Sequence, residues 1–225
     1  RENVELVLIP HAAKEYSGFC ALTALASIKN PDTIDYFYIL STKHSEGETC
    51  TVGKRPKIWR KLQPGLKPCS EKIKQSEHSV HNTAELLKAI FPKVKRRTFV
   101  LIDYSKDFVD FLELRWKAAK EAEKRIVFVC NSDFSHYGGH FDIMMDEQLL
   151  QYTKQKKEEK LIEAILHANT IYSFQDVNYC GGGVLRTMVE LCKRFELVGK
   201  VTMAYDSCTM PHCLQKACMF RMSPE

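Results

Sequence analysis

The chain has 225 residues, of which 33 are Lys or Arg and 28 are Asp or Glu, and its formal charge of +5 is mild for this length. A hydrophobic fraction of 44% is enough for a sizeable core and excludes a disordered protein. No apolar run approaches the 18 or more residues of a membrane-spanning helix, so we expect no membrane span and a single domain over residues 1–225.

Apolar runs of strand length alternate with helical patterns along the chain. We expect strands at 4–9, 36–40, 98–103, 125–130, 200–205 and 217–222, and helices at 18–28, 82–91, 106–123, 146–152, 157–167 and 184–195. Asn82 is interpreted as the cap of its helix, and residues 41–76 as a long loop. The alternation predicts an α/β fold with a mainly parallel central sheet flanked by helices. The nearly continuous apolar character of the strands is typical of a sheet covered on both faces.

Two short basic clusters, at 54–61 and 93–97, are the only strongly charged features. A basic patch of this kind can bind phosphate or nucleic acid. Acidic residues elsewhere dilute the charge, however, and no recognition motif accompanies either cluster. We therefore expect solvated surface and no nucleic-acid partner.

The nine cysteines indicate a cellular compartment. An odd number cannot all pair within one chain, and a core of this size does not need disulfides for its stability. Cys20 and Cys130 lie in apolar stretches and are interpreted as core thiols. The N-terminal residues contain no apolar secretory segment. These features favour a reducing compartment, the cytoplasm or the nucleus, with thiols rather than disulfides.

Histidines follow three of the predicted strands. His11 comes after the first strand, His44 after the second, and His136 after the strand at 125–130. Sites in open α/β sheets form beyond the carboxyl ends of the strands, so these residues would meet in one crevice. A single such histidine is most often structural. Three in equivalent places indicate a shared metal or catalytic site.

Cys180 lies in the stretch NYCGGG, directly before the predicted helix at 184–195. The positive end of a helix dipole lowers the pKa of a nearby thiol, and glycines permit close approach of backbone or ligand. Cys180 is thus a candidate nucleophile or soft metal ligand. The alternative is a flexible start to the helix with Cys180 as a bystander. A P-loop is excluded because no Lys-Ser or Lys-Thr pair follows the glycines.

Five motifs together resemble the Memo family, whose fold is related to the class III extradiol ring-cleaving dioxygenases. The most specific is NSDFSHYG at 131–138, which is close to the family's SSDFSHYG. The others lie at 10–18, 39–44, 77–79 and 178–181, where they are similar to the family's PHAGYxYSG, GPSHH, EHS and CG elements. The resemblance extends from residue 4 to about residue 195 and so covers most of the chain.

The resemblance implies a metal site formed by His11, His44 and Cys180, with Asp133 and His136 in the neighbouring cleft. Four further residues are expected to line this cleft: Tyr16, Glu77, His78 and His81. Two imidazoles and one thiolate form a softer ligand set than the two histidines and one carboxylate of the dioxygenases. This set favours Cu(I) or zinc and still permits Fe(II), and the resemblance implies copper or iron as the expected metal, with zinc as a further option.

Three functions follow from these residues. The first is a Memo-like metal-binding protein with a redox or signalling role, whose partner in the resemblance is a phosphotyrosine peptide. The second is a metal-dependent dioxygenase or other oxidoreductase acting on a small aromatic ligand, in which His136 is the acid or base and Asp133 orients its partner. The third is an interaction protein that retains the cleft without using its metal. The thiol in place of a carboxylate ligand favours the first.

Overall fold

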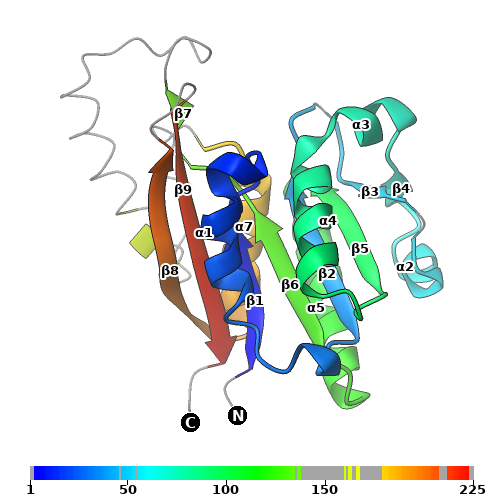
Figure 1. The fold of residues 1–225 in the computed structure, drawn as a ribbon. Helices are drawn as coiled ribbons and strands as arrows, with labels where there is room; N and C mark the ends of the chain where they lie inside the picture. The colour runs from blue at the N-terminus through cyan, green and yellow to red at the C-terminus, as the bar shows by residue number, and fades with distance from the viewer. Residues whose placement is uncertain are drawn as a thin grey trace.

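A computed structural model describes residues 3–45, 47–53, 55–134, 136–137, 160, 162–163, 166–167, 179–207 and 212–222. In these residues a nine-stranded mixed sheet has the order β4-β3-β5-β2-β6-β1-β9-β7, and β8 pairs with β9 (Figure 1). The strands are β1 (Val4–Ile9), β2 (Tyr36–Thr42), β3 (Cys50–Val52), β4 (Lys67–Pro68), β5 (Arg97–Ile102), β6 (Ile126–Asn131), β7 (His136–Tyr137), β8 (Leu197–Ser207) and β9 (His212–Met222). The helices are α1 (Lys14–Leu25), the short 3-10 helix η1 (Pro31–Thr33), α2 (Lys57–Leu62), α3 (Glu71–Ser76), α4 (His78–Ile90), α5 (Lys106–Glu121) and α7 (Gly182–Arg194).

The four central strands are parallel, which confirms the predicted α/β sheet. β1 pairs with β6, and β2 lies between β6 and β5. Antiparallel strands extend the sheet at both edges, because β9 runs against β1 and β3 runs against β5. The carboxyl ends of β1, β2 and β6 consequently lie at one edge of the sheet, where open α/β folds form their sites.

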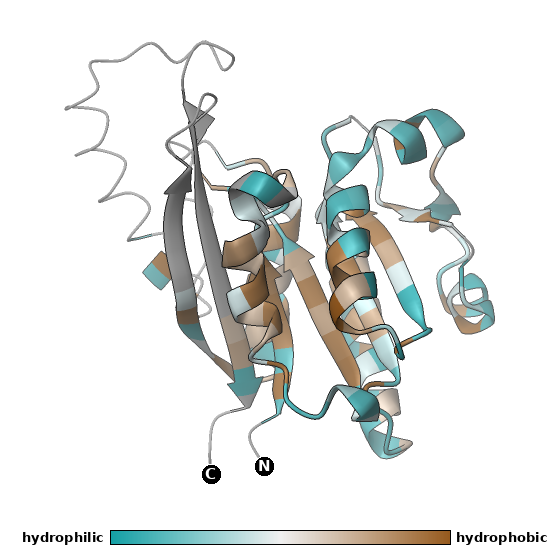
Figure 2. Ribbon diagram, viewed as in Figure 1, coloured by the Kyte–Doolittle hydropathy of each residue, from teal (hydrophilic) through white to brown (hydrophobic). Residues whose placement is uncertain are grey.

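Side chains on the central strands alternate between two cores, one on each face of the sheet. In β1, Leu6 and Leu8 face the larger core under α5 and α7, while Val7 and Ile9 face the core under α1 and α4. Figure 2 shows the hydrophobic residues gathered on these strands and on the inner sides of the helices. Both faces are therefore covered, as the continuous apolar runs predict.

The prediction of one long loop over residues 41–76 is wrong. β2 continues to Thr42, and the segment after it contains β3, α2, β4 and α3. Trp59 of α2 is completely buried and packs edge-on against Tyr38, with ring centroids 5.0 Å apart. These short elements therefore belong to the folded domain.

A disulfide joins Cys50 and Cys69. The expectation that all nine cysteines remain thiols is thus wrong for this pair, and with it the argument from free thiols to a reducing compartment. The disulfide links β3 to the residue before the Ser70 cap of α3, and it belongs to a small cluster with Val80. Cys20 and Cys130 are buried in the core, as expected.

The predicted helix boundaries are shifted in several places. The helix expected at 82–91 begins four residues earlier, at His78, and its N-cap is Glu77 rather than Asn82. The helix expected at 18–28 begins at Lys14 and ends at Leu25. The helix expected at 146–152 lies outside the described residues, as does most of the one expected at 157–167. No helix within the described ranges is both long and apolar enough to cross a membrane.

Candidate metal centre

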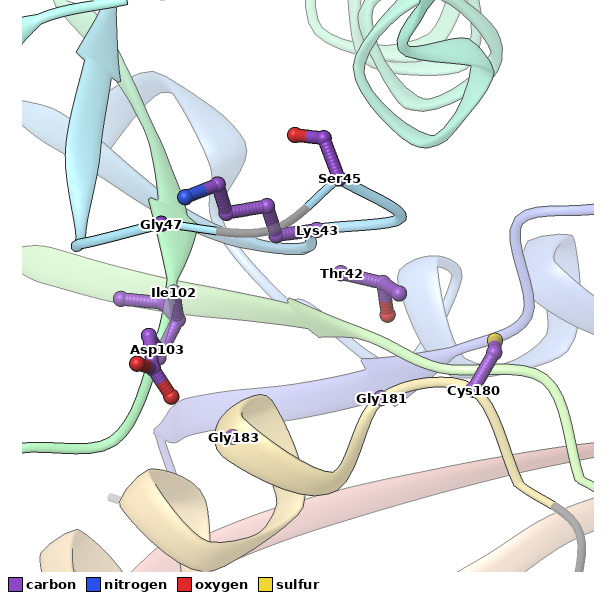
Figure 3. Close-up of a pocket in the computed structure, with 9 residues that line it drawn as sticks. All are labelled: Thr42, Lys43, Ser45, Gly47, Ile102, Asp103, Cys180, Gly181 and Gly183. Carbon is purple, nitrogen blue, oxygen red and sulfur yellow. The ribbon is translucent and has the colours of Figure 1, made fainter.

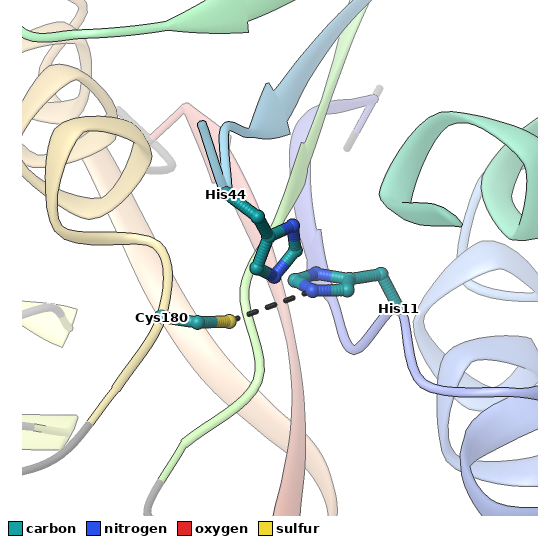
Figure 4. Close-up of side chains that lie close together, drawn as sticks. All are labelled: His11, His44 and Cys180. Atoms are coloured by element: carbon teal, nitrogen blue, oxygen red, sulfur yellow. Dashed lines mark hydrogen bonds between the residues drawn. The ribbon is translucent and has the colours of Figure 1, made fainter. Parts of the chain in front are cut away.

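Three side chains from separate parts of the chain meet beyond the carboxyl ends of the central strands. His11 follows β1, His44 follows β2, and Cys180 immediately precedes the Gly181 cap of α7 (Figure 4). One nitrogen of each ring and the sulfur of Cys180 all lie within 4.8 Å of one another. Within the group, Nε2 of His11 and Sγ of Cys180 are 3.5 Å apart.

His11 is held rigidly and is almost inaccessible, with 1% of its surface exposed. Its backbone N–H donates to Oδ1 of Asp133 at 2.8 Å, and its carbonyl accepts a hydrogen bond from the Asn82 amide at 2.8 Å. Burial lowers the pKa of His11 to about 4, with Asp133 acting in the opposite direction. The ring is therefore neutral at physiological pH, which is the form that binds metals.

His44 is fixed by Glu77 at two points. Its backbone N–H donates to Oε2 at 3.0 Å, and its Nδ1 lies 2.6 Å from Oε1. Figure 4 shows the other ring nitrogen turned toward Cys180 and His11. The side chain of His44 is 34% exposed, so it forms the accessible side of the group, whereas His11 forms its buried floor.

Cys180 lies at a bend just before the Gly181 cap of α7. Its N–H donates to the Asp133 carbonyl at 3.3 Å. A Cβ added to Gly181 would lie 2.7 Å from Oγ1 of Thr42 and would also collide with Ser132, so the backbone can pass here only without a side chain. Burial, and then the charge of Asp133, raise the pKa of Cys180 to about 12. The predicted lowering by the helix dipole is therefore wrong for the metal-free site.

A buried polar network beneath the group was not found by sequence reasoning. The Asn131 side chain accepts from the Thr42 N–H at 2.8 Å, and its NH₂ group shares its two protons among the Ser41 hydroxyl, the Ser79 carbonyl and the Thr83 hydroxyl. It thereby ties the end of β6 to the end of β2 and to the first turn of α4. The available signal was the run of small polar residues at the strand ends, where buried polar groups require partners.

The remaining predicted residues are placed differently. His78 lies beside the group, with its ring stacked on His44 at 4.4 Å. His81 is exposed, and its Nε2 is 2.8 Å from the Lys74 carbonyl, apart from the three ligand candidates. Tyr16 lies in α1 and His136 in β7, but their side chains are outside the described part of the structure. The carboxylate of Asp133 is directed at the backbone of His11 and Ala12, which makes it a support for the group.

A cavity of about 280 Å³ adjoins Cys180. Thr42, Lys43 and Ser45 line one side, and Gly181 and Gly183 of the α7 start line the other (Figure 3). In this view Lys43 and Asp103 lie at the end opposite Cys180. A small ligand in this cavity would therefore approach the three side chains from the side of the thiol.

The donor set fits a metal ion. A tetrahedral zinc-type site holds its nitrogen and sulfur ligand atoms roughly 3.3 to 3.8 Å apart, and the His11–Cys180 pair at 3.5 Å already meets this requirement. Nδ1 of His11 is buried and has no hydrogen-bond partner among the described residues. Nδ1 is not the nitrogen that faces Cys180, so this unpartnered atom is not evidence for the ion; the nitrogen available as a ligand is Nε2.

Comparisons with known proteins identify relatives of this chain. The model of the family described as Memo-like protein matches residues 54–210, more than half of the chain. His11 and His44 precede this range, and Cys180 lies within it. A MEMO1 family protein of Methanococcoides burtonii is 27% identical over 85% of this chain and 75% of its own length. A MEMO1 family protein of Desulfurococcus amylolyticus is 27% identical over 82% of this chain and 70% of its own.

A solved structure shares the fold at low sequence identity. It is an uncharacterized protein of Escherichia coli K12, JW3007, with a TM-score of 0.50 and 10% identity over 96% of this chain and 99% of that one. This likeness concerns the arrangement of strands and helices alone. The family match and the two curated relatives reach the same conclusion from the sequence: the chain belongs to the family of Memo-like proteins.

Proposed function

We propose that this chain is a metal-binding protein that holds one copper or iron ion through His11, His44 and Cys180. The observation that carries the proposal is the convergence of two imidazoles and one thiol within 4.8 Å, from three distant parts of the sequence. One thiolate among two imidazoles is a soft set, which suits Cu(I) and zinc and still permits Fe(II). Three protein ligands leave a coordination position for a further ligand.

A redox or signalling role is the form of this function that we favour. The open position next to the cavity at Cys180 supports it, because a bound ion there could exchange ligands or electrons with a small molecule. The phosphotyrosine peptide as partner rests on the family resemblance. The dioxygenase alternative depends on His136, whose side chain lies outside the described residues, and on Asp133, whose carboxylate is already engaged by two backbone N–H groups.

Metal analysis of the purified protein tests the proposal. Wild type is equilibrated with Cu, Fe or Zn salts, freed of excess metal, and measured by elemental analysis. We expect about one ion per chain for the preferred metal and a large loss in Cys180→Ala. Cys20→Ala is the matched control, because it removes a buried thiol that is not part of the group. Equal and low metal content in wild type and Cys180→Ala would show that the proposal is wrong.

A further inference from the structure

We propose that Glu77 is a positioning residue of the metal centre: its carboxylate fixes the tautomer and the orientation of His44, so that Nε2 is the nitrogen presented to the metal. The inference rests on the proposed metal binding and assigns to Glu77 a role that neither the family match nor the ligand set specifies. It concerns the one ligand of the three that is substantially exposed, with 34% of its side chain accessible.

The geometry of the contact carries the proposal. One carboxylate holds both the ring and the backbone of His44, through Oε1 to Nδ1 at 2.6 Å and Oε2 to the N–H at 3.0 Å. Two attachment points on one residue restrict both the chain direction and the rotation of the ring. An exposed histidine would otherwise sample several rotamers, and the entropy of ordering it would weaken metal binding.

The carboxylate is itself held in place. Glu77 is 3% exposed and lies at the junction of α3 and α4, where its N–H donates to the Ile73 carbonyl at 3.0 Å and its own carbonyl accepts from Val80 at 3.2 Å. The Ser79 hydroxyl lies 2.7 Å from the Thr42 carbonyl and 3.1 Å from Oε1 of Glu77, so its single proton is shared between these two acceptors. Glu77 is thus connected to the end of β2, two residues before His44.

The chemistry of the contact selects one tautomer. An ionised carboxylate accepts hydrogen bonds and cannot donate them. Both oxygens of Glu77 face His44: Oε2 accepts a hydrogen bond from its backbone N–H, and Oε1 lies 2.6 Å from Nδ1 of its ring. The neutral ring of His44 must therefore carry its proton on Nδ1, which leaves the lone pair on Nε2. A carboxylate behind a metal-binding histidine commonly has this role.

A competing arrangement uses the same residues as ligands. His44, Glu77 and His78 also bring one ligand atom each within 4.8 Å of one another. However, both oxygens of Glu77 already accept hydrogen bonds from donors within the protein. The rings of His44 and His78 are stacked with an interplanar angle of 29°, and ring nitrogens bind in the ring plane, so stacked rings do not converge well on one ion. The positioning role fits these contacts better.

The test compares Glu77→Gln with Glu85→Gln in the full chain. Glu85 is an exposed residue of the helix α4, so Glu85→Gln removes the same charge at a position that is not part of the metal group. In Glu77→Gln, the amide NH₂ can face Nδ1 and move the ring proton to Nε2, which blocks the metal-binding nitrogen. We expect metal affinity, measured with zinc and a competing chelator, to fall about 10- to 100-fold in Glu77→Gln and to stay within about twofold in Glu85→Gln.

Nitrogen-15 NMR of the metal-free protein separates this inference from the proposed function. We expect His44 to carry its proton on Nδ1 in wild type and in Glu85→Gln, and to lose this preference in Glu77→Gln. A wild-type His44 protonated on Nε2, or unchanged zinc affinity in Glu77→Gln, would overturn the inference. A wild type with the expected tautomer that binds no metal would support the positioning of His44 and overturn the proposed function.

Two further variants complete the design. His78→Ala should retain metal binding; if it loses the ion as fully as Glu77→Gln does, the metal lies between His44, Glu77 and His78, and the positioning role is refuted. Should Glu77→Gln fail to fold, Glu77→Asp retains the charge but withdraws the carboxylate by one methylene. The same loss of the Nδ1 tautomer and of zinc affinity is expected there, and full retention of both would count against the inference.

Discussion

The dependence of metal affinity on pH follows directly from the burial of Cys180. A metal binds the thiolate, so binding must release the thiol proton whenever the metal-free site holds one. Burial raises the pKa of this thiol to about 12. Between pH 7.5 and 9 the thiol therefore remains protonated, while the buried ring of His11, with its pKa of about 4, is neutral over the same range. Each ion bound should release one proton throughout this window.

The size of the change in metal affinity with pH distinguishes this buried thiol from an ordinary one. With one proton released per ion, affinity rises tenfold per pH unit, or about thirtyfold from pH 7.5 to 9. A thiol with the ordinary pKa of about 8.5 would already be mostly ionised at pH 9, and the rise would be only about eightfold. The direction is the same in both cases, so the test lies in the slope above pH 8.5.

Zinc is the suitable probe because it has no redox chemistry of its own. Its affinity is measured by competition with a chelator of known pH dependence, and proton release is measured separately in weakly buffered solution. Cys180→Ala should bind zinc more weakly, and its affinity should vary little over this range. A wild-type curve that levels off near pH 8.5 would refute the effect of burial on the thiol.

Three other predictions concern stability. Because burial lowers the pKa of His11 to about 4, the unfolded chain takes up a proton on this residue before the folded chain does as the pH falls. The metal-free protein should therefore lose about 3 kcal/mol of unfolding free energy between pH 6.5 and 4. Urea denaturation at a series of pH values should show a flatter dependence of stability on pH for His11→Asn. Replacing both Cys50 and Cys69 by Ala should cost about 3 kcal/mol and make thermal unfolding insensitive to reductant; a reductant effect that persists would contradict the assigned disulfide. Gly181→Ala should cost about 1–3 kcal/mol by forcing a Cβ against buried side chains, whereas Gly182→Ala, whose Cβ would have its nearest contact at 3.3 Å, should cost less in the same chemical denaturation assay.

The central sheet could be predicted because its strands are marked by composition alone. The run from Val4 to Ile9 is buried at every position, and its predicted and observed limits coincide. A strand covered on both faces has a continuous apolar sequence, which few other elements of that length share. The meeting of His11 and His44 followed from the same prediction, since both come after parallel strands whose carboxyl ends lie at one edge.

The segment after β2 could not be predicted in the same way, because its elements are too short to show periodicity. β3 has three residues and α2 has six. Isolated elements of this length are marginal in water, so they form here through tertiary contacts. The buried ring of Trp59 and the Cys50–Cys69 disulfide supply such contacts. The sequence around one partner of a long-range contact does not indicate which distant residue is the other partner.

Cys180 shows why a correct location can accompany a wrong electrostatic prediction. Its place before α7 was read correctly from the sequence, and a helix dipole does favour a thiolate. Burial acts in the opposite direction and prevails, which the sequence does not reveal because burial is a property of the assembled fold. The raised pKa separates the two roles that the sequence left open for Cys180, those of nucleophile and of metal ligand. With its pKa raised to about 12 by burial, the thiol stays protonated at neutral pH, which disfavours it as a nucleophile. A metal ion replaces the proton itself, so the same burial that disfavours Cys180 as a nucleophile remains compatible with its role as a ligand.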